Sequence, residues 1–179
     1  MSKNKPPGVV TEMQFLRIRV ENWRAVVARE ITFGNGVNIV EGANEAGKSS
    51  FIEALNLLFR ERDSSKKKEI RSIAPKGHDV GSTVLLEFKS GDYHLTYQKT
   101  FNRRPATSLL MHAPEILQFT GLAAHEKVQS ILESTIDFGL WQALQLEQGA
   151  EFAHINLRHS GGLAASPVPA PPAALSSAA

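Results

Sequence analysis

Eight residues in the first third of the chain have the types and spacing that bind a phosphate group. They read Gly42-x-x-x-x-Gly47-Lys48-Ser49, a complete phosphate-binding loop pattern. The glycines let the backbone curve around a phosphate, and the successive N–H groups and the next helix N-terminus supply partial positive charge. Lys48 is placed to reach the β- and γ-phosphates of a nucleotide, and the Ser49 hydroxyl is placed to bind Mg²⁺. The motif therefore predicts a site for a nucleotide and its magnesium ion.

The segments on either side of this loop have the order that the motif requires. Val37–Val40 is a short β-branched run that favours a buried strand, and Ser50–Phe59 has apolar residues at helical spacing. Strand, loop and helix thus follow one another, which argues against a chance match in an ordinary turn.

Further elements are predicted from the alternation of apolar and polar residues and from turn signals. The predicted strands are Phe15–Val20, Glu30–Phe33, Val84–Lys89 and Tyr93–Lys99, of which the last two form a hairpin. A helix is predicted from Ala123 to Leu132, with Thr120 as its cap. We therefore expect an α/β fold.

Composition excludes several other classes of protein. The 179 residues carry 20 Lys and Arg against 18 Asp and Glu, and 42% are hydrophobic, which is enough for a core. The absence of cysteine excludes a disulfide scaffold, a zinc finger and a thiol nucleophile. We find no export signal and no apolar segment long enough to span a bilayer, so we expect a cytoplasmic protein without membrane contact.

The folded part of the chain is predicted to end before its last twenty residues. Residues 160–179 contain no charged side chain and consist almost entirely of Ala, Pro, Ser and Gly, so we expect a low-complexity tail there. We expect residues 1–12 to be a disordered leader and residues 13–159 to form one lobe.

Two stretches carry a resemblance to a known family. Leu16–Arg24 and Gly36–Ser50 resemble the N-terminal lobe of SMC-like ABC ATPases, and within them the SbcC-type double-strand-break repair ATPases. The loop form Asn-Glu-Ala-Gly-Lys-Ser-Ser points to that group rather than to kinases or small GTPases. The resemblance runs from about Phe15 to about Glu151. It implies the N-terminal lobe of a P-loop NTPase head of ABC type, with a mixed sheet, an antiparallel β-hairpin subdomain and flanking helices.

The resemblance also implies which residues hold ATP and Mg²⁺. The implied nucleotide contacts are Arg24, Gly42, Asn44, Glu45, Ala46, Gly47, Lys48, Ser49 and Ser50. Gln148, followed by Gly149, matches the family's Q-loop glutamine, which contacts Mg²⁺ and the attacking water; Gln145 is the second candidate. Lys48 and Gln148 would then be catalytic, and Ser49 and Gln148 would bind the metal. An isolated arginine such as Arg24 is equally consistent with a solvated turn.

The family ATPase needs a second lobe with a signature Ser-Gly-Gly, an apolar strand ending in Asp-Glu and a switch histidine. We find none of these, and Ser160-Gly-Gly162 lies too soon after Gln148 to be that signature. The chain therefore looks like an N-terminal half. The resemblance implies that it hydrolyses ATP when a C-terminal lobe or second head completes it. It also implies DNA and a nuclease subunit as partners, in double-strand-break repair or DNA organisation.

An alternative of another class is a non-catalytic, nucleotide-dependent DNA-binding or interaction module. The basic run Lys66–Lys68 fits contacts with DNA phosphates, but three adjacent lysines are more often a solvated loop. A GTPase is disfavoured because the chain lacks the Asn-Lys-x-Asp tetrapeptide that recognises guanine.

Overall fold

Residues 13–42 and 47–135 are described by the computed structural model, and they form six strands and three helices. The strands are β1 (Met13–Trp23), β2 (Val26–Thr32), β3 (Ser82–Ser90), β4 (Tyr93–Phe101), β5 (Ala106–Ala113) and β6 (Leu117–Thr120). The helices are α1 (Lys48–Arg60), α2 (Lys68–Ser72) and α3 (Gly121–Thr135). The predicted leader and the tail from residue 160 lie outside this part of the chain.

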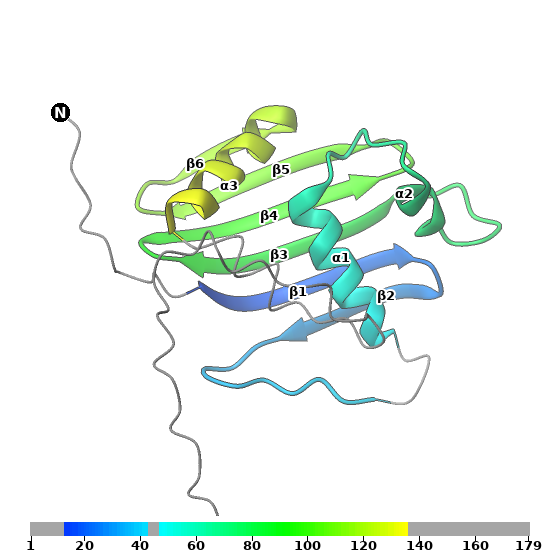
Figure 1. Cartoon of the computed structure of the whole chain (residues 1–179), viewed down its shortest axis with the longest axis horizontal. Coiled ribbons are helices and arrows are strands. Elements are labelled where there is room, and N and C mark those ends of the chain that lie inside the picture. The colour runs from blue at the N-terminus through cyan, green and yellow to red at the C-terminus, as the bar shows by residue number, and fades with distance from the viewer. Residues whose placement is uncertain (1–12, 43–46, 136–179) are drawn as a thin grey trace, which may run out of the picture. The chain divides into compact units, whose positions relative to one another are not determined.

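The strands make one sheet in the order β2-β1-β3-β4-β5-β6, in which every neighbouring pair is antiparallel (Figure 1). The α/β architecture, the flanking helices and the hairpin are confirmed, the hairpin being β3 and β4 joined at Gly91. A mixed sheet was predicted, but all five pairs of the described strands are antiparallel, since each strand returns directly beside its neighbour and no parallel pair occurs among them. Strands β5 and β6 and the short helix α2 were not predicted.

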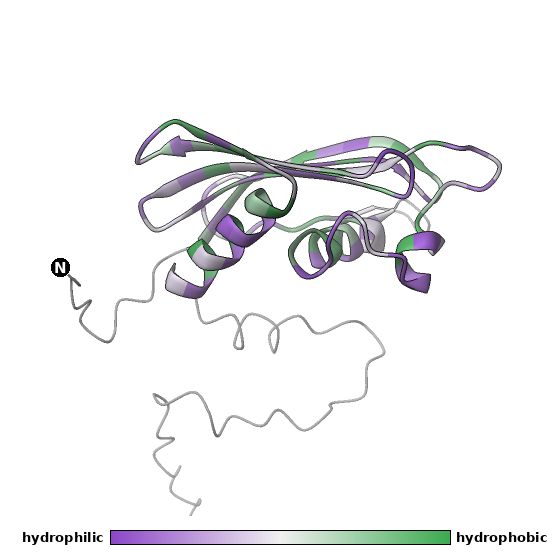
Figure 2. Ribbon diagram, turned by 90° about the horizontal axis from the view of Figure 1, so that it is seen from above, coloured by the Kyte–Doolittle hydropathy of each residue, from purple (hydrophilic) through white to green (hydrophobic). Residues whose placement is uncertain are grey.

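One face of the sheet is covered by the helices, whereas no described helix lies on the other face (Figure 2). The covered face follows from the period-2 pattern of β3 and β4, which buries Val84, Leu86 and Phe88 on one strand and Leu95 and Tyr97 on the other.

Helix α1 packs on this apolar face through Phe59 near its C-terminus. The Phe59 ring lies edge-on to Phe88, with 5.8 Å between ring centroids, and stacks on Tyr97 at 6.4 Å. Aromatic pairs in these arrangements add stabilisation beyond the apolar area that they bury. The helix predicted from Ser50 to Phe59 is therefore confirmed, and it extends by two residues at its start.

The buried strand predicted at Val37–Val40 is wrong for this structure. The segment forms no strand, and Val37 and Ile39 are 92% and 78% exposed. A strand needs a neighbour to pair its backbone N–H and C=O groups, and none of the described strands pairs with this segment. An apolar run thus lies uncovered directly before the phosphate-loop residues.

Strand β4 also buries a charged side chain. Lys99 is fully buried, and its ammonium donates to the carbonyl oxygens of Leu58, at 2.6 Å, and Glu61, and to Nδ1 of His125, at 3.1 Å. Burial lowers the pKa of Lys99 to about 7, although the carboxylates of Asp63 and Glu61 act in the opposite direction. The three donors of the ammonium thus have three acceptors.

Replacing Lys99 by methionine should flatten the pH dependence of stability above pH 7. The folded chain releases the Lys99 proton near pH 7, whereas the unfolded chain holds it up to about pH 10.5. The unfolded state therefore binds more protons in this window, and the free energy of unfolding rises with pH. Urea unfolding of the parent chain and of Lys99→Met, between pH 6 and 10, measures the difference. Equal slopes in the two chains would contradict this titration.

Gly81, directly before β3, should not tolerate a side chain. A Cβ there would lie 2.6 Å from the Arg103 carbonyl oxygen and 2.6 Å from Cγ2 of Thr100. We expect Gly81→Ala to lower the free energy of unfolding by about 1–3 kcal/mol, because the backbone oxygen cannot move aside freely. Gly34→Ala is the control, since its Cβ would meet only Asn38 Oδ1 at 3.7 Å. Similar denaturant midpoints for both variants would refute the expected clash.

Candidate functional site

The phosphate-loop motif ends where α1 begins, at a glycine that no other residue fits well. Gly47 has φ 86° and ψ 14°, in the left-handed region, and Lys48 and Ser49 are the first residues of α1. A Cβ on Gly47 would lie 2.8 Å from Cγ2 of Val26 on β2. Both backbone conformation and packing therefore favour glycine here, and the predicted junction of loop and helix is present.

Lys48 lies beside a hollow next to the loop. Its ammonium donates to the Gly42 carbonyl oxygen, so the side chain links the two glycine ends of the motif. It lines a hollow of about 220 Å³ together with charged residues of β2 and of the segment before the loop. The lining residues are Arg29, Glu30, Ile31, Val40, Glu41, Lys48 and Phe51. The Lys48 side chain therefore borders this hollow and is not enclosed in the packed core.

The turn between β1 and β2 is tied to α1 through Glu53. The Glu53 carboxylate accepts a hydrogen bond from Nε1 of the buried Trp23, at 3.0 Å. It also forms an ion pair with the Arg24 guanidinium, with 2.5 Å between nitrogen and oxygen. Arg24 itself has φ 53°, and its backbone N–H donates to the Ile73 carbonyl oxygen at 2.7 Å. The structure therefore places the Arg24 guanidinium beside the helix that carries Lys48. Its contact with a nucleotide stays a prediction.

Part of the predicted site lies in the described residues. Arg24, Gly42, Gly47, Lys48, Ser49 and Ser50 are placed, and the Ser50 N–H donates to the Gly47 carbonyl oxygen at 3.0 Å. The predicted contacts Asn44, Glu45, Ala46, Gln145 and Gln148 lie outside the described residues. Glu53 and Arg29, which also border this region, were not predicted from the sequence. For Glu53 a signal existed, since it is an acid that interrupts an otherwise apolar helix segment.

In the basic run Lys66–Lys68, which leads into α2, one lysine forms an ion pair within the chain and the other two are exposed. Lys67 pairs with Glu61, whose carboxylate also accepts a hydrogen bond from Ser65 at 3.1 Å. The nitrogen–oxygen distance in the lysine pair is 2.6 Å. Lys66 and Lys68 are exposed on either side. The segment therefore combines an ion pair that fixes the loop with two outward lysines.

In residues 13–42 and 47–135, no cluster of three or more His, Cys, Asp or Glu side chains is arranged to hold a metal ion. No helix in the same ranges has the length and apolar character needed to cross a membrane.

Comparison with known proteins agrees with the predicted resemblance. An uncharacterised protein of Mycobacterium tuberculosis, Rv1278, is 42% identical over 146 residues, which cover 81% of this chain and 17% of that protein. A DNA double-strand break repair Rad50 ATPase of Thermoplasma acidophilum is 36% identical over 89 residues, which cover 49% of this chain and 10% of that protein. The chain thus spans about a sixth of the first of these relatives and a tenth of the second.

A solved structure of the recombination mediator protein RecF with ATP aligns at 23% identity and a TM-score of 0.45. The alignment covers 67% of this chain and 31% of RecF. The family model described as AAA domain matches residues 17–157, which include the whole phosphate loop. The predicted relation to the N-terminal lobe of SMC-like ABC ATPases is confirmed by the family model and by the Rad50 relative. The chain belongs to the AAA domain family.

Proposed function

We propose that this chain binds ATP–Mg²⁺ through Gly42–Ser49, as the N-terminal lobe of an ABC-type ATPase head that comprises residues 13–159. The observation that carries the proposal is the junction at Gly47, where a left-handed glycine leads directly into α1. Lys48 and Ser49 then stand at a helix N-terminus, where backbone N–H groups favour an anion. No acidic side chain lies in the first turn of this helix to repel a phosphate.

Within this site we assign a role to each candidate residue. Lys48 would bind the β- and γ-phosphates, and the Ser49 hydroxyl would help to hold Mg²⁺. Bound Mg²⁺ would supply charge neutralisation at the phosphate oxygens. Gln148 would orient the attacking water and help to hold the ion, and Gln145 is the second candidate for that role. Glu53 keeps Arg24 beside α1, which supports a place for this arginine near the nucleotide.

Hydrolysis would require a C-terminal lobe or a second head that supplies the general base. The exposed apolar side chains of Val37, Ile39 and Val40 support this part of the proposal, because an apolar run normally becomes buried. Ile52, on the first turns of α1, is also 54% exposed. The relatives are several times longer than this chain, so such a lobe has room elsewhere in proteins of this kind.

We further propose a cytoplasmic role in double-strand-break repair or DNA organisation, with DNA and a nuclease subunit as partners. The name of the Thermoplasma relative supports the repair process. The small net charge of +2 gives the chain little long-range attraction for DNA. Contact with DNA would therefore be local or shared with other parts of the assembly.

The alternative is a nucleotide-dependent DNA-binding or interaction module without hydrolysis. The exposed positions of Lys66 and Lys68 favour it to a limited extent, because both side chains are open to a phosphate backbone. In that case nucleotide binding would regulate the contact with DNA instead of driving turnover.

Lys48→Ala should weaken the binding of ATP–Mg²⁺ by roughly tenfold or more, because it removes the cation that meets the phosphates. Calorimetric titration of the chain with ATP and Mg²⁺ measures the affinity. Lys89→Ala is the matched control, since Lys89 is an exposed lysine on β3. We expect little hydrolysis by the chain alone. Turnover that Lys48→Ala abolishes would contradict the need for another lobe, and equal affinities would contradict the assigned site.

Replacing both Lys66 and Lys68 by glutamate separates the two proposed functions. If the alternative holds, salt-dependent binding of a DNA duplex falls sharply while ATP affinity stays unchanged, because two phosphate contacts become repulsive. Fluorescence anisotropy of a labelled duplex at several salt concentrations measures this. Unchanged DNA binding would leave Lys66 and Lys68 as solvated side chains and reject the alternative.

A further inference from the structure

The C-terminal end of α1 is held by side chains from two other elements. Lys99 of β4 donates to the carbonyl oxygens of Leu58 and Glu61, and Nε2 of Gln129 on α3 donates to that of Phe59 at 2.5 Å. The last carbonyls of a helix lack partners within the helix. Three carbonyls at and just beyond the last turn of α1 are thus fixed by groups from β4 and α3.

His125 connects this end of α1 to α3 through Lys99. Its Nδ1 lies 3.1 Å from the Lys99 ammonium and 3.1 Å from the Tyr97 hydroxyl. Because an ammonium has donors only, His125 accepts its bond on Nδ1. Burial, followed by the charges of Lys99 and Arg62, lowers the pKa of His125, which favours the neutral ring that can accept.

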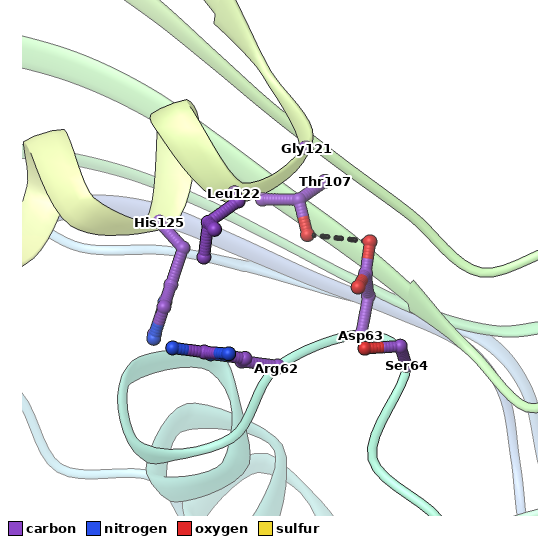
Figure 3. A pocket seen from close by; sticks show the side chains of 7 residues that line it. All are labelled: Arg62, Asp63, Ser64, Thr107, Gly121, Leu122 and His125. Carbon is purple, nitrogen blue, oxygen red and sulfur yellow. Dashed lines mark hydrogen bonds between the residues drawn. The ribbon is translucent and has the colours of Figure 1, made fainter.

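A small pocket borders the same cluster. Figure 3 shows Arg62 and His125 on one side of this pocket, and Asp63 bonded to Thr107 on the other, with 2.9 Å between Oδ2 of Asp63 and Oγ1 of Thr107. The charged groups that act on Lys99 and His125 are Glu61, Asp63, Arg62 and Glu126. The loop after α1 is therefore fixed to β5 beside the helix end that Lys99 holds.

Stability alone gives little reason for a lysine at this position. A fully buried ammonium has a large desolvation cost, and an apolar side chain of similar length would avoid it. A positive charge at a helix C-terminus does, however, interact favourably with the helix dipole and with the unpaired carbonyls. Lys99 thus places a buried charge, at a cost in desolvation free energy, at the C-terminal end of α1, the described helix that begins at the phosphate loop.

We propose that Lys99 is a positioning residue for the phosphate loop. By fixing the C-terminus of α1 against β4 and α3, it sets the place of Lys48 and Ser49 at the other end. The 13 residues of α1 form a rigid element about 20 Å long, so a shift at one end reaches the other. The inference rests on the proposed binding of ATP–Mg²⁺. Beyond that function, the inference identifies Lys99, a residue far from the loop, as one that affects the affinity for ATP–Mg²⁺.

The test compares Lys99→Met with Lys89→Met, a matched exchange at an exposed lysine of β3. We expect ATP–Mg²⁺ to bind about tenfold more weakly to Lys99→Met, because release of the far end of α1 lets Lys48 and Ser49 move from their places at the loop. Lys89→Met should bind as the parent chain does. Equal affinity of the parent and Lys99→Met would overturn the inference.

A pH profile distinguishes positioning from a general loss of structure. In the parent chain, affinity should fall as pH rises through about 7, because Lys99 then loses the proton that makes its third bond. Lys99→Met should lack this component, so the ratio of the two affinities should fall as pH rises but stay above one, because the neutral amine keeps two N–H donors for the Leu58 and Glu61 carbonyl oxygens. Lys99→Arg, charged throughout, should keep affinity without the pH-dependent fall. A ratio that does not change with pH would overturn the inference.

Hydrogen exchange provides a readout that needs no nucleotide. Amides in residues 57–61, at the end of α1, should exchange faster in Lys99→Met than in Lys89→Met. Unchanged exchange would overturn the claim that Lys99 holds this end of the helix. If the parent chain failed to bind ATP–Mg²⁺ at any pH, the proposed function would fall, and hydrogen exchange would still decide whether Lys99 fixes α1.

Discussion

The packing of α1 against the apolar face of β3 and β4 is the contact on which the rest of the structure depends. Phe59 lies between Phe88 and Tyr97 at one end of the helix, and Gly47 meets Val26 at the other. A helix fixed at both ends presents its N-terminus at a defined place on the sheet. The loop before it can then be short and rich in glycine, because the scaffold rather than the loop provides the rigidity.

Two kinds of interaction hold this helix, and they affect stability in opposite ways. The aromatic contacts bury apolar surface and stabilise the fold. The Lys99 cluster buries a charge, which costs free energy, yet it supplies directional bonds that apolar packing lacks. Apolar packing permits a helix to slide or rotate slightly, whereas hydrogen bonds to particular carbonyl oxygens restrict both movements.

The local patterns predicted the fold where burial depends on neighbours in sequence. The alternation in Val84–Lys89 and Tyr93–Lys99 was enough to predict β3 and β4, and the helical spacing after Lys48 was enough for α1. Val37–Val40 failed because its apolar residues indicate burial, but burial needs a covering partner that no described residue supplies. A strand pattern therefore predicts a preference for burial, and the partner decides whether the strand forms.

In the candidate site, too, local sequence patterns predicted some features, whereas others depend on residues distant in sequence. Gly47 and Lys48 could be identified from spacing alone, because the chemistry of phosphate binding fixes both residue type and order. Alternation along β4 places Lys99 on the same face as Leu95 and Tyr97, but the acceptors that surround its ammonium could not be predicted from the sequence. Its acceptors belong to α1, the residue after it and α3, and they lie up to 41 residues from Lys99 along the chain. Contacts of this kind become visible only once the fold is known.

The uncovered segment Val37–Val40 has a consequence for how the chain behaves at high concentration. It follows β2, one of the two edge strands among the described strands, and Val40 lines the same hollow as Ile31 of that strand. An open sheet edge next to bare apolar side chains is the usual starting point for intermolecular strand pairing. The proposed second lobe would therefore also cover this edge, and so prevent the sheets of two copies from pairing edge to edge.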